Sequence, residues 1–573
     1  MRRTAADYMA DALAQVGVKR IYGVVGDSLN GFSDSLRRLK TIDWVHVRHE
    51  EGAAFAATAE AHLTGELAVC AGSCGPGNLH LINGLFDAHR SGVPVLAIAA
   101  HIPSTEIGID FFQATHPEIL FKECSHYVEL VSHADQLPQV LARAIRVAVG
   151  QKGVAVVVIP GDVALQPVKS AIPKWLAPKD PVVVPNEDQL RELADLLNRG
   201  KRVTMLCGAG CKGAHDEVVQ LAGLLKAPIV HALRGKEFIE HDNPFDVGMT
   251  GLLGFASGYW AMKNCDTLLM VGTDFPYRQF IPADATIAQI DIRPAALGNR
   301  CALDLGVVGS AGATLNALLP LIDAKPNSSH LDDAISDYRK ARAGFDALAE
   351  SGPSTRYIHP QYVNRLASEL ADDDAIFTVD VGTPVAWAAR YLKLNGRRRL
   401  LGSFNHGSMA NAMLHAIGAQ AAFPERQIIS MSGDGGFTMM MGEFVTLIQQ
   451  KLPVKVILLN NGTLGFVEME MKASGFLDTG CELINPNFAA MAEAMGVKGI
   501  RVEAPQDLKA AMQELLAHDG PALLDVVSAR QELVMPPSTN LDEAHKFGMF
   551  MMKAVLDGRA GELIDLAKEN LLR

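Results

Sequence analysis

Oxygen-bearing side chains follow two apolar segments that we expect to be neighbouring strands. Asp434 follows residues 428–432 after one glycine, Gly433, and Asn461 ends a segment that starts at residue 455, with 24 residues between the Gly-Asp-Gly and Asn-Asn motifs. Because parallel strands bind ligands at their carboxyl ends, the two side chains are expected to meet. Carboxylate and amide oxygens suit Mg²⁺, which usually keeps phosphate oxygens in its shell. The spacing therefore predicts a magnesium ion that anchors a phosphorylated ligand.

Glycines accompany both candidate ligands. Gly435 and Gly436 follow the carboxylate, and Gly462 and Gly465 follow the amide. Without a Cβ atom they let the backbone approach phosphate closely, and a helix that starts after Gly436 offers unpaired N–H groups to the anion. Each motif alone is also an ordinary turn sequence. Together, each after a Val- and Ile-rich segment, they resemble the signature of the thiamine diphosphate-dependent enzymes.

This resemblance implies a thiamine diphosphate cofactor and a Mg²⁺ ion coordinated by Asp434, the side chain of Asn461 and the backbone carbonyl of Thr463. It also implies cofactor contacts from residues that flank these ligands and from a third segment, namely Gly435, Gly436, Gly462, Leu464, Gly465, Phe466, Gly407, Ser408 and Met409. In the family, the carbonyl of Gly407 meets the cofactor's amino group and Met409 props the cofactor in a bent conformation. Met409 also fits a core methionine that fills space.

A further carboxylate, Glu50, lies where a strand at residues 44–47 gives way to a helix of small residues. Thiamine chemistry needs a carboxylic acid hydrogen-bonded to ring nitrogen N1′, and a dry pocket that raises the pKa of this acid serves the role best. His49-Glu50 resembles the motif of the activating glutamate in thiamine decarboxylases and oxidases. The alternative is that Glu50 and Glu51 are solvated acids in a helix's first turn. A zinc HExxH motif is excluded because Ala53 replaces its second histidine.

Two residues of the same block, Phe112 and Gln113, complete this half of the candidate site. The resemblance places both beside the substrate, whereas a buried aromatic and a turn glutamine are the structural alternatives. The family takes Glu50 from one subunit and the diphosphate loops from another. A homo-oligomer, a tetramer, with sites between its subunits is therefore implied.

The middle of the chain carries candidate flavin contacts. Residues 208–213 match GxGxxG after a strand, a pattern that is weak on its own. Across nearly the whole chain, the sequence resembles the quinone-dependent pyruvate dehydrogenases of bacteria. That likeness implies FAD bound by three segments, with the contacts Gly251, Leu252, Leu253, Gly254, Asp274, Phe275, Pro276, Tyr277, Arg278, Asp291 and Ile292. Asp274 departs from the neutral amide expected there, which leaves its flavin contact open.

The implied reaction is the oxidation of pyruvate to acetate and CO2, with electrons passed through FAD to ubiquinone. Phe466 corresponds to an aromatic that moves into the active site and assists electron transfer, or it is a hydrophobic plug. The alternatives are an acetolactate synthase-like carboligase with non-redox FAD, an acetyl-phosphate-forming pyruvate oxidase and a silent binding subunit. The presence of Glu50, Asp434 and Asn461 together favours an enzyme.

Parallel sheets are needed to position these residues, and the chain predicts three of them. Short Val- and Ile-rich runs alternate with helical patterns, which is typical of parallel sheets covered on both faces. The predicted strands are 20–25, 44–47, 67–71, 93–99, 154–160, 202–207, 228–232, 267–272, 286–292, 375–379, 427–432, 455–460 and 522–527. The predicted fold class is α/β, with three doubly wound parallel-sheet domains and a C-terminal helical tail.

Proline-rich margins divide the chain into these domains. Residues 166–185 and 325–360 predict connections, because prolines interrupt regular elements. We assign four parts: 1–182, a thiamine pyrimidine-binding domain; 183–334, a FAD-binding central domain; 335–530, a thiamine diphosphate and Mg²⁺ domain; 531–573, a membrane-associating segment.

Composition narrows the partners further. The chain has 52 Lys and Arg against 64 Asp and Glu, and the net charge of -12 argues against nucleic acid and anionic lipid as electrostatic partners. Asp7 and Asp11 interrupt the amino end, so no signal peptide is expected, and no run approaches the ~20 apolar residues of a membrane span. The cysteines lack metal-finger spacing, so free cytosolic thiols are expected.

The carboxyl end predicts an amphipathic helix. Its apolar and acidic residues recur on opposite sides, Ala560, Ile564, Ala567 and Leu571 against Glu562, Asp565 and Glu569. The resemblance implies that this helix inserts into a phospholipid surface to reach ubiquinone, with the protein cytoplasmic and peripheral on the inner face of the cell membrane. A polar face this acidic is atypical for lipid binding, and packing against the parent domain is the alternative.

Overall fold

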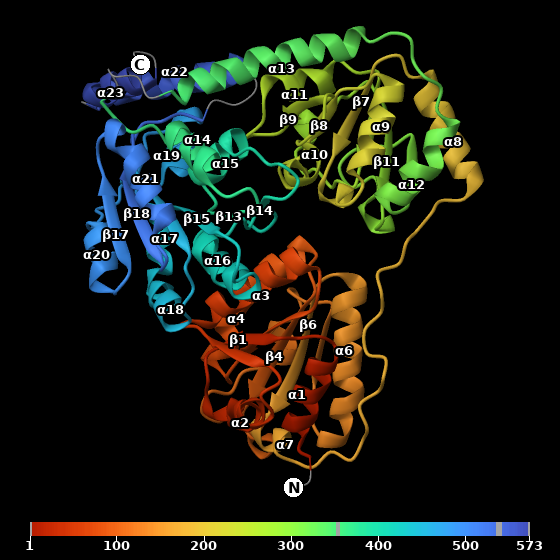
Figure 1. Cartoon of the computed structure of the whole chain (residues 1–573), viewed down its shortest axis with the longest axis vertical. Coiled ribbons are helices and arrows are strands. Elements are labelled where there is room, and N and C mark those ends of the chain that lie inside the picture. Colours follow the sequence, from red (N-terminus) through yellow and green to blue (C-terminus); the bar gives the residue numbers. More distant parts are fainter. Residues whose placement is uncertain (1–2, 351–355, 535–540, 558, 571–573) are drawn as a thin grey trace.

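The computed structural model describes residues 3–350, 356–534, 541–557 and 559–570. Within these residues, the strands form three parallel sheets of six strands each. The strand pairs of these sheets all run parallel, and helices cover both faces of each sheet (Figure 1). The α/β fold class with a helical tail is therefore confirmed.

The first sheet has the order β2-β1-β3-β4-β6-β5. Its strands are β1 (Arg20–Gly23), β2 (Asp43–His46), β3 (Ala68–Gly72), β4 (Val95–His101), β5 (Tyr127–Leu130) and β6 (Val154–Pro160). Its helices are α1 (Ala5–Gln15), α2 (Asn30–Leu39), α3 (Glu50–Thr64), α4 (Pro76–Ser91), α5 (Pro117–Leu120), α6 (Leu137–Gln151) and α7 (Gly161–Ala164). Separate apolar cores fill the two faces, with α1, α2 and α6 on one and α3 and α4 on the other.

The middle sheet has the order β12-β11-β10-β7-β8-β9, which matches the 3-2-1-4-5-6 order of dinucleotide-binding folds when read from β9. Its strands are β7 (Val203–Cys207), β8 (Ile229–His231), β9 (Asp246–Met249), β10 (Thr267–Val271), β11 (Thr286–Asp291) and β12 (Leu305–Val308). Its helices are α8 (Glu187–Arg199), α9 (His215–Leu225), α10 (Lys236–Ile239), α11 (Ala256–Lys263) and α12 (Ala311–Leu318).

The glycines of the GxGxxG match join the two strands at the centre of that sheet. Gly210 N donates to Gly272 O at 2.9 Å, and a Cβ on Gly210 would lie 2.6 Å from Gly272 Cα. The loops after β7 and β10 therefore touch each other directly. These glycines serve close backbone packing at the point where the strand order reverses.

The third sheet has the order β14-β13-β15-β16-β18-β17, the same as the first when each is numbered from its own first strand. Its strands are β13 (Ile376–Val379), β14 (Arg399–Leu401), β15 (Ile428–Gly433), β16 (Lys455–Asn460), β17 (Lys498–Val502) and β18 (Ala522–Val527). Its helices are α14 (Pro360–Leu370), α15 (Thr383–Tyr391), α16 (Asn411–Ala422), α17 (Asp434–Met439), α18 (Phe444–Gln449), α19 (Gly465–Ala473), α20 (Phe488–Ala494) and α21 (Leu508–Ala517). Because β15 and β16 are neighbours, the loops that follow them meet.

Five strands escaped prediction, β5, β9, β12, β14 and β17, and all five are edge strands. Edge strands bury less of their surface, so they lack the continuous apolar run of central parallel strands. In β17, for example, only Val502 is buried, and β14 is three residues long. The strands that were predicted are those with a neighbouring strand on each side, together with the edge strand β2.

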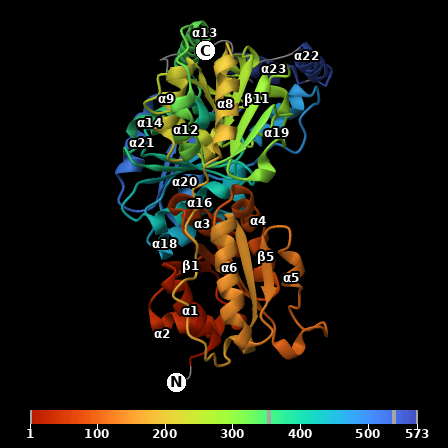
Figure 2. The ribbon, with the colours of Figure 1, turned by 90° about the vertical axis from the view of Figure 1, so that its right-hand side faces the viewer.

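The first and third domains share one apolar core. Helices α3 and α4 lie between the two sheets together with α16 (Figure 2). A Cβ on Gly418 would lie 2.0 Å from Ala56 O, so small residues allow α16 and α3 to pack backbone to backbone. Phe55 and Met413 belong to the same core cluster. This contact fixes the start of α3, and so Glu50, relative to the third domain.

Three helices lie along the outer side of the middle and third domains: α13 (Ser329–Leu348), α22 (Leu541–Leu556) and α23 (Ala560–Asn570) (Figure 1). Glu562 pairs with Lys472 at 2.6 Å, and Glu569 accepts from Gln531 N at 2.6 Å, so these acids face the protein. Ile564 instead is 55% exposed. The acidic side of the predicted amphipathic helix therefore packs against the third domain through Glu562 and Glu569, while Leu571 lies outside the described residues. Among the helices described, none is both long and apolar enough to cross a membrane.

Candidate active site

The structure brings Asp434 against the Asn461 loop. Asp434 begins α17 at the carboxyl end of β15 and is 2% exposed. Its carboxylate accepts from Gly462 N at 2.7 Å, from Asn485 Nδ2 at 2.7 Å and from Gly435 N at 2.9 Å. Burial raises the pKa of this acid. A buried carboxylate with several fixed donors is held in one orientation, as a metal ligand must be.

The Asn461 loop is itself clamped by the segment that follows it. Asn461 Oδ1 accepts from Thr463 N at 3.2 Å, and Gly462 has φ +69, the left-handed region. Leu464 N donates to Cys481 O at 2.8 Å, and Leu483 N donates to Gly462 O at 2.9 Å. The two residues predicted to bind the metal from this loop therefore sit on a backbone with little freedom.

Asn485 is a site residue that the sequence analysis missed. Its Nδ2 atom donates both to Asp434 and, at 2.9 Å, to Asn460 Oδ1, so it joins the ends of β15 and β16. An asparagine before a proline reads as an ordinary turn, and no spacing marks it as a partner of Asp434. Only the folded contact shows this bridging role.

The donor set and the surrounding space fit a diphosphate held through Mg²⁺. A Cβ on Gly435 would lie 2.6 Å from a methyl of Leu464 and 3.3 Å from Met409 Cε, and one on Gly436 would lie 2.1 Å from Asp380 Oδ2. Both positions therefore favour glycine, because a Cβ atom there would crowd the neighbouring groups. Met409 is partly exposed beside Gly435 rather than buried in a core, which favours the wedge interpretation.

Glu50 begins α3 and is 8% exposed, so it is not a solvated first-turn acid. Its Oε2 lies 2.9 Å from His80 Nδ1, and the His80 ring stacks on His49 at 4.1 Å. His49 Nδ1 in turn accepts from Glu51 N at 3.2 Å and caps the helix. A Cβ on Gly77 would lie 3.0 Å from Glu50 Oε1, so this glycine leaves space at the carboxylate.

Phe112 and Gln113 lie on the Glu50 side of the molecule. Cys74 Sγ donates to Gln113 Oε1 at 3.3 Å, and a Cβ on Gly75 would lie 2.8 Å from Gln113 Cβ. Gln113 has φ +60, a conformation that non-glycine residues rarely adopt. Phe112 is 76% exposed, so the alternative of a buried aromatic is wrong. The Cys74–Gly77 turn thus connects these two residues to Glu50.

The Gly407–Met409 segment lies between the first and third domains. Asn83 Nδ2 donates to Ser408 Oγ at 3.0 Å and to Glu51 Oε1 at 2.7 Å. Gly407 has φ +80, and the next turn places Ala410 at φ +67. A left-handed alanine is a strained arrangement that the surroundings must hold, and such strain clusters at functional sites.

In the described part of the chain, no hydrogen bond or ion pair joins Glu50 to Asp434 or Asn461. One buried acid instead links their two domains. Glu443, nine positions after Asp434, accepts from Arg48 N at 2.9 Å and from His49 N at 2.6 Å. Burial raises the pKa of Glu443. The candidate site therefore has two halves, and each is rigid.

Three family models match the chain in this order: an N-terminal thiamine pyrophosphate-binding domain over residues 3–121, a central domain over 190–318 and a C-terminal thiamine pyrophosphate-binding domain over 380–526. A putative thiamine pyrophosphate-containing protein of Bacillus subtilis is 36% identical over 569 residues, 99% of this chain and 98% of the relative. The chain belongs to the thiamine pyrophosphate-dependent enzyme family.

Relatives within this family differ in their named reactions. A pyruvate oxidase of Lactiplantibacillus plantarum is 31% identical over 92% of this chain and 89% of its own length. The large subunit of acetolactate synthase isozyme 1 of Escherichia coli is 30% identical over 93% of this chain and 96% of its own length. The identities are nearly equal, so likeness alone does not choose between the two reactions.

In this thiamine pyrophosphate-dependent enzyme, two predicted flavin segments touch each other in the middle domain. Gly251 has φ +97, and a Cβ there would lie 3.2 Å from the ring of Phe275, which is 5.5 Å from the ring of Tyr277. The neighbouring Thr250 Oγ1 is buried and has no hydrogen-bond partner within the described structure. An unpartnered buried hydroxyl and a glycine held against two aromatic rings fit a flavin nucleotide at this position.

The departure at Asp274 has a local explanation. Arg300 Nε donates to Asp274 Oδ1 at 2.8 Å, and Arg300 Nη2 donates to Oδ2 at 3.2 Å. The paired guanidinium offsets the charge that an acid would otherwise bring near flavin phosphates. Asp291 ends β11 and accepts from Arg293 N at 2.9 Å, so it too has a protein partner.

Phe466 lies in the first turn of α19, directly after the Asn461 loop, and is partly exposed. Burial raises the pKa of Tyr277, and Glu470 of the same helix adds to that increase. Phe466 stands at the metal-loop end of α19.

Proposed function

We propose that this chain oxidatively decarboxylates pyruvate to acetate and CO2 with thiamine diphosphate, Mg²⁺ and FAD, and passes the electrons to ubiquinone. The observation that carries the proposal is the 2.7 Å contact of Asp434 with Gly462 N, which gathers a magnesium-type donor set beside Asn461. Support for FAD as a cofactor comes from the strand order of the middle sheet and from the packing of Gly251 against the ring of Phe275.

Asp434, Asn461 and the carbonyl of Thr463 would hold the Mg²⁺ ion, and the backbone at Gly435 and Gly436 would approach the diphosphate. Thiamine diphosphate, when bound, supplies a carbon nucleophile for the keto group and accepts the electron pair released as CO2 leaves. The protein's part is to orient that group and to exclude water. The fixed donors to Asp434 help to orient that group, and the burial of Asp434 helps to exclude water.

Glu50 would hold the proton that activates the aminopyrimidine. Its side chain is buried, so bulk water has little access to the carboxyl group. His80 Nδ1 lies 2.9 Å from Glu50 Oε2 and can exchange a proton with that oxygen. His80 is the more exposed of the two side chains and so connects this pair to solvent.

Pyruvate would bind beside Phe112 and Gln113. Phe112 projects from its own domain into solvent, as a residue that acts on a neighbouring subunit's pocket must. Cys74 holds the amide of Gln113, which fixes a polar group near Glu50. Phe466 would close the pocket from the opposite half and stand towards the flavin.

The proposal includes a homo-oligomer, a tetramer, with Glu50 of one subunit facing the Asp434 half of another. Within the described residues, Glu50 has no hydrogen bond or ion pair with Asp434 or Asn461, and a second subunit would supply the facing half in this arrangement. Ile484, beside Asn485, is 98% exposed, so the proposed arrangement would place this apolar side chain of the Asp434 half at the contact with the second copy. Phe112 supplies the matching apolar group on the Glu50 side.

Membrane attachment through the tail, on the inner face of the cell membrane, belongs to the same proposal. The tail helices expose several large apolar side chains, Met551, Met552, Val555, Leu556 and Ile564. Burying these groups in lipid would have to outweigh repulsion between a chain of net charge -12 and anionic headgroups. Docking against α19 through Lys553 and Gly475 describes the resting arrangement.

A carboligase of the acetolactate synthase type is the second candidate, because relatives of that name match as well as the pyruvate oxidase does. An acetyl-phosphate-forming oxidase is the third. The test is to add pyruvate to the purified holoenzyme without oxygen and follow the flavin absorbance, then add ubiquinone with and without lipid vesicles. Bleaching followed by quinone-driven recovery is expected. A flavin that stays oxidised while acetolactate accumulates refutes the proposal, as does a requirement for phosphate with acetyl phosphate as product.

A further inference from the structure

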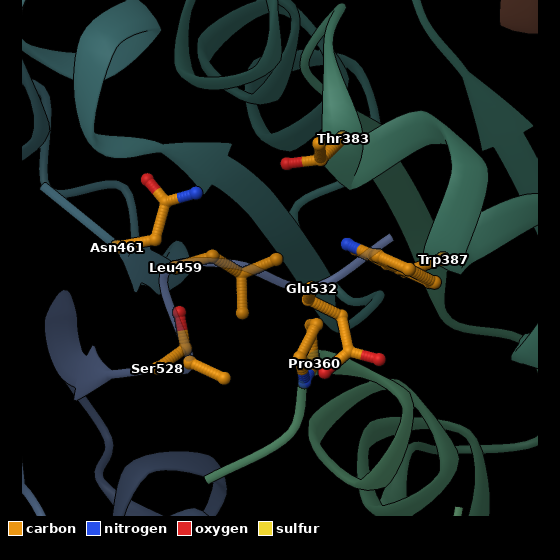
Figure 3. Close-up of a pocket in the computed structure, with 8 residues that line it drawn as sticks. Pro360, Thr383, Trp387, Leu459, Asn461, Ser528 and Glu532 are labelled. Carbon is orange, nitrogen blue, oxygen red and sulfur yellow. The ribbon is translucent and has the colours of Figure 1, made fainter. Parts of the chain in front are cut away.

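One helix of the third domain connects the metal loop to a predicted flavin segment. Thr383, at the start of α15, lines a small cavity together with Asn461 and Trp387 (Figure 3). Arg390, near the end of the same helix, donates from Nε to Leu253 O at 3.0 Å and from Nη2 to Gly254 O at 3.4 Å. Thr383 and Arg390 are seven positions apart, which corresponds to about 10 Å of helix.

Arg390 is an unusual residue to find at this place. It is 3% exposed, and burial lowers its pKa to about 10, so it still carries its charge at neutral pH. The ring of Phe345 lies 5.0 Å from the guanidinium carbon. A buried charge persists only where fixed partners compensate its lost hydration. Here the partners include two backbone carbonyls of another domain, so the arginine restrains that backbone.

The turn that Arg390 holds has two sides. Leu253 packs against the apolar core of the third domain, and its carbonyl points to the guanidinium. On the other side, Gly251 lies against Phe275, and Leu252 is exposed. Within the turn, Gly254 N donates to Gly251 O at 2.9 Å, so a shift of the carbonyl side moves the Gly251 side as well.

We propose that Arg390 is a positioning residue for the flavin, one that fixes the Gly251–Gly254 turn to the domain that carries the magnesium loop. This inference rests on the proposed function, because it takes that turn as a flavin contact. Helix α15 then sets the separation between the thiamine and flavin binding segments. The middle domain contributes the flavin contacts, and the third domain determines where they stand.

Arg390→Met and Arg390→Lys, each measured for FAD affinity in the purified full chain, test the inference. Removing the guanidinium group leaves the carbonyls of Leu253 and Gly254 without this donor, so we expect Arg390→Met to weaken FAD binding about tenfold or more. Arg390→Lys keeps the charge without the planar guanidinium group, so its FAD affinity should lie between those of the wild type and Arg390→Met. The flavin's visible circular dichroism should change in both variants. Thiamine diphosphate and Mg²⁺ binding should stay close to that of the wild type.

Arg398→Met is the matched control. Arg398 is also buried in the third domain, but it donates to carbonyls of its own domain, Ser368 O, Ala371 O, Asp372 O and Lys393 O. Its replacement should lower thermal stability without changing FAD affinity. Equal loss of FAD in both variants would make Arg390 a structural residue only and overturn the inference.

The remaining outcomes are also decisive. Wild-type affinity for FAD and an unchanged flavin spectrum in Arg390→Met overturn the inference. If that variant does not fold, the lysine variant decides in the same way, and Phe345→Leu should weaken FAD binding modestly by removing the ring beside the guanidinium. A wild-type flavin that pyruvate fails to bleach counts against the proposed function, whereas selective FAD loss in Arg390→Met would still support the positioning role.

Discussion

The carboxylate of Glu443 lies 2.6 Å from the backbone nitrogen of His49, although the two residues are 394 positions apart in the chain. Glu443 belongs to the domain of the metal loop, and His49 directly precedes the candidate activating acid Glu50. The same carboxylate also accepts from Thr446 Oγ1 at 2.6 Å. This buried acid, together with the hydrogen bond between Asn83 and Ser408, thus ties the two halves of the candidate site within one chain.

Glu443→Ala should lower both stability and turnover. It leaves the partly buried N–H groups of Arg48 and His49 without their acceptor, which costs about 2 kcal/mol of the free energy of unfolding. We expect kcat to fall by about tenfold or more because Glu50 loses its fixed position. Glu443→Gln keeps an acceptor oxygen and should retain most of the activity. Urea unfolding and steady-state kinetics of both variants measure this, and equal kinetics in Glu443→Ala and wild type would contradict it.

Two adjacent glycines should tolerate alanine differently. At Gly435 the new Cβ would meet the movable ends of Leu464 and Met409, whereas at Gly436 it would meet Asp380 at 2.1 Å and Ala410 N at 3.1 Å. Overpacking against fixed groups costs roughly 1–3 kcal/mol. Gly436→Ala should therefore be less stable and bind thiamine diphosphate more weakly than Gly435→Ala. The reverse order in cofactor titration would show that the loop is not packed as described.

Phe112→Ala should affect function and leave stability alone. An exposed side chain contributes little to folding, so the unfolding free energy should change by less than about 0.5 kcal/mol. The KM for pyruvate should rise if Phe112 lines the pocket of a neighbouring subunit. Phe476→Ala, at another exposed phenylalanine, is the control and should leave KM unchanged. Identical KM values for wild type and Phe112→Ala would remove this residue from the site.

Glu237 should make the junction of the three domains sensitive to acid. Burial alone would raise the pKa of Glu237, but His62 and Arg399 outweigh it and lower the pKa from 4.5 to about 2. Arg399 Nε donates to it at 2.7 Å, and Leu400 N at 3.1 Å. Because the pKa of Glu237 is lower in the folded protein than in the unfolded chain, ionised Glu237 stabilises the fold above pH 4.5. That contribution is lost as the pH falls towards 2.

The size of this effect is on the order of 3 kcal/mol. Glu237→Gln should lower the free energy of unfolding at neutral pH. The difference in this free energy between the variant and the wild type should become smaller as the pH falls below 4.5. Glu187→Gln, at an exposed acid, should leave the pH profile unchanged. Urea midpoints between pH 7 and 3.5 measure both. A constant gap across that range would mean that Glu237 does not titrate as described.

The sequence predicted the central strands and the meeting of Asp434 with the Asn461 loop because both follow from local patterns. Val- and Ile-rich runs mark strands that are buried on both faces, and ligand loops gather at the carboxyl ends of neighbouring strands. Edge strands such as β17 carry no such run. They could not be separated from loops before their partners were known.

Residues whose role depends on a distant partner also escaped prediction. Asn485, Glu443 and Arg390 stand in ordinary turn or helix sequences, and the partners Asp434, His49 and Leu253 lie 51, 394 and 137 residues away in sequence. The side of the tail helix that faces the protein was not predicted, for a related reason. Its helical period was visible, but which side faces the protein depends on Lys472 and Gln531.

The most direct test of the account is the release of CO2 from pyruvate by the purified holoenzyme and its Glu50→Gln variant, at saturating thiamine diphosphate and Mg²⁺. The account predicts release by the wild type and a fall of about 10²-fold or more in the variant, with cofactor binding retained. A variant that turns over at a rate close to the wild type, or a wild type that releases no CO2, would contradict it.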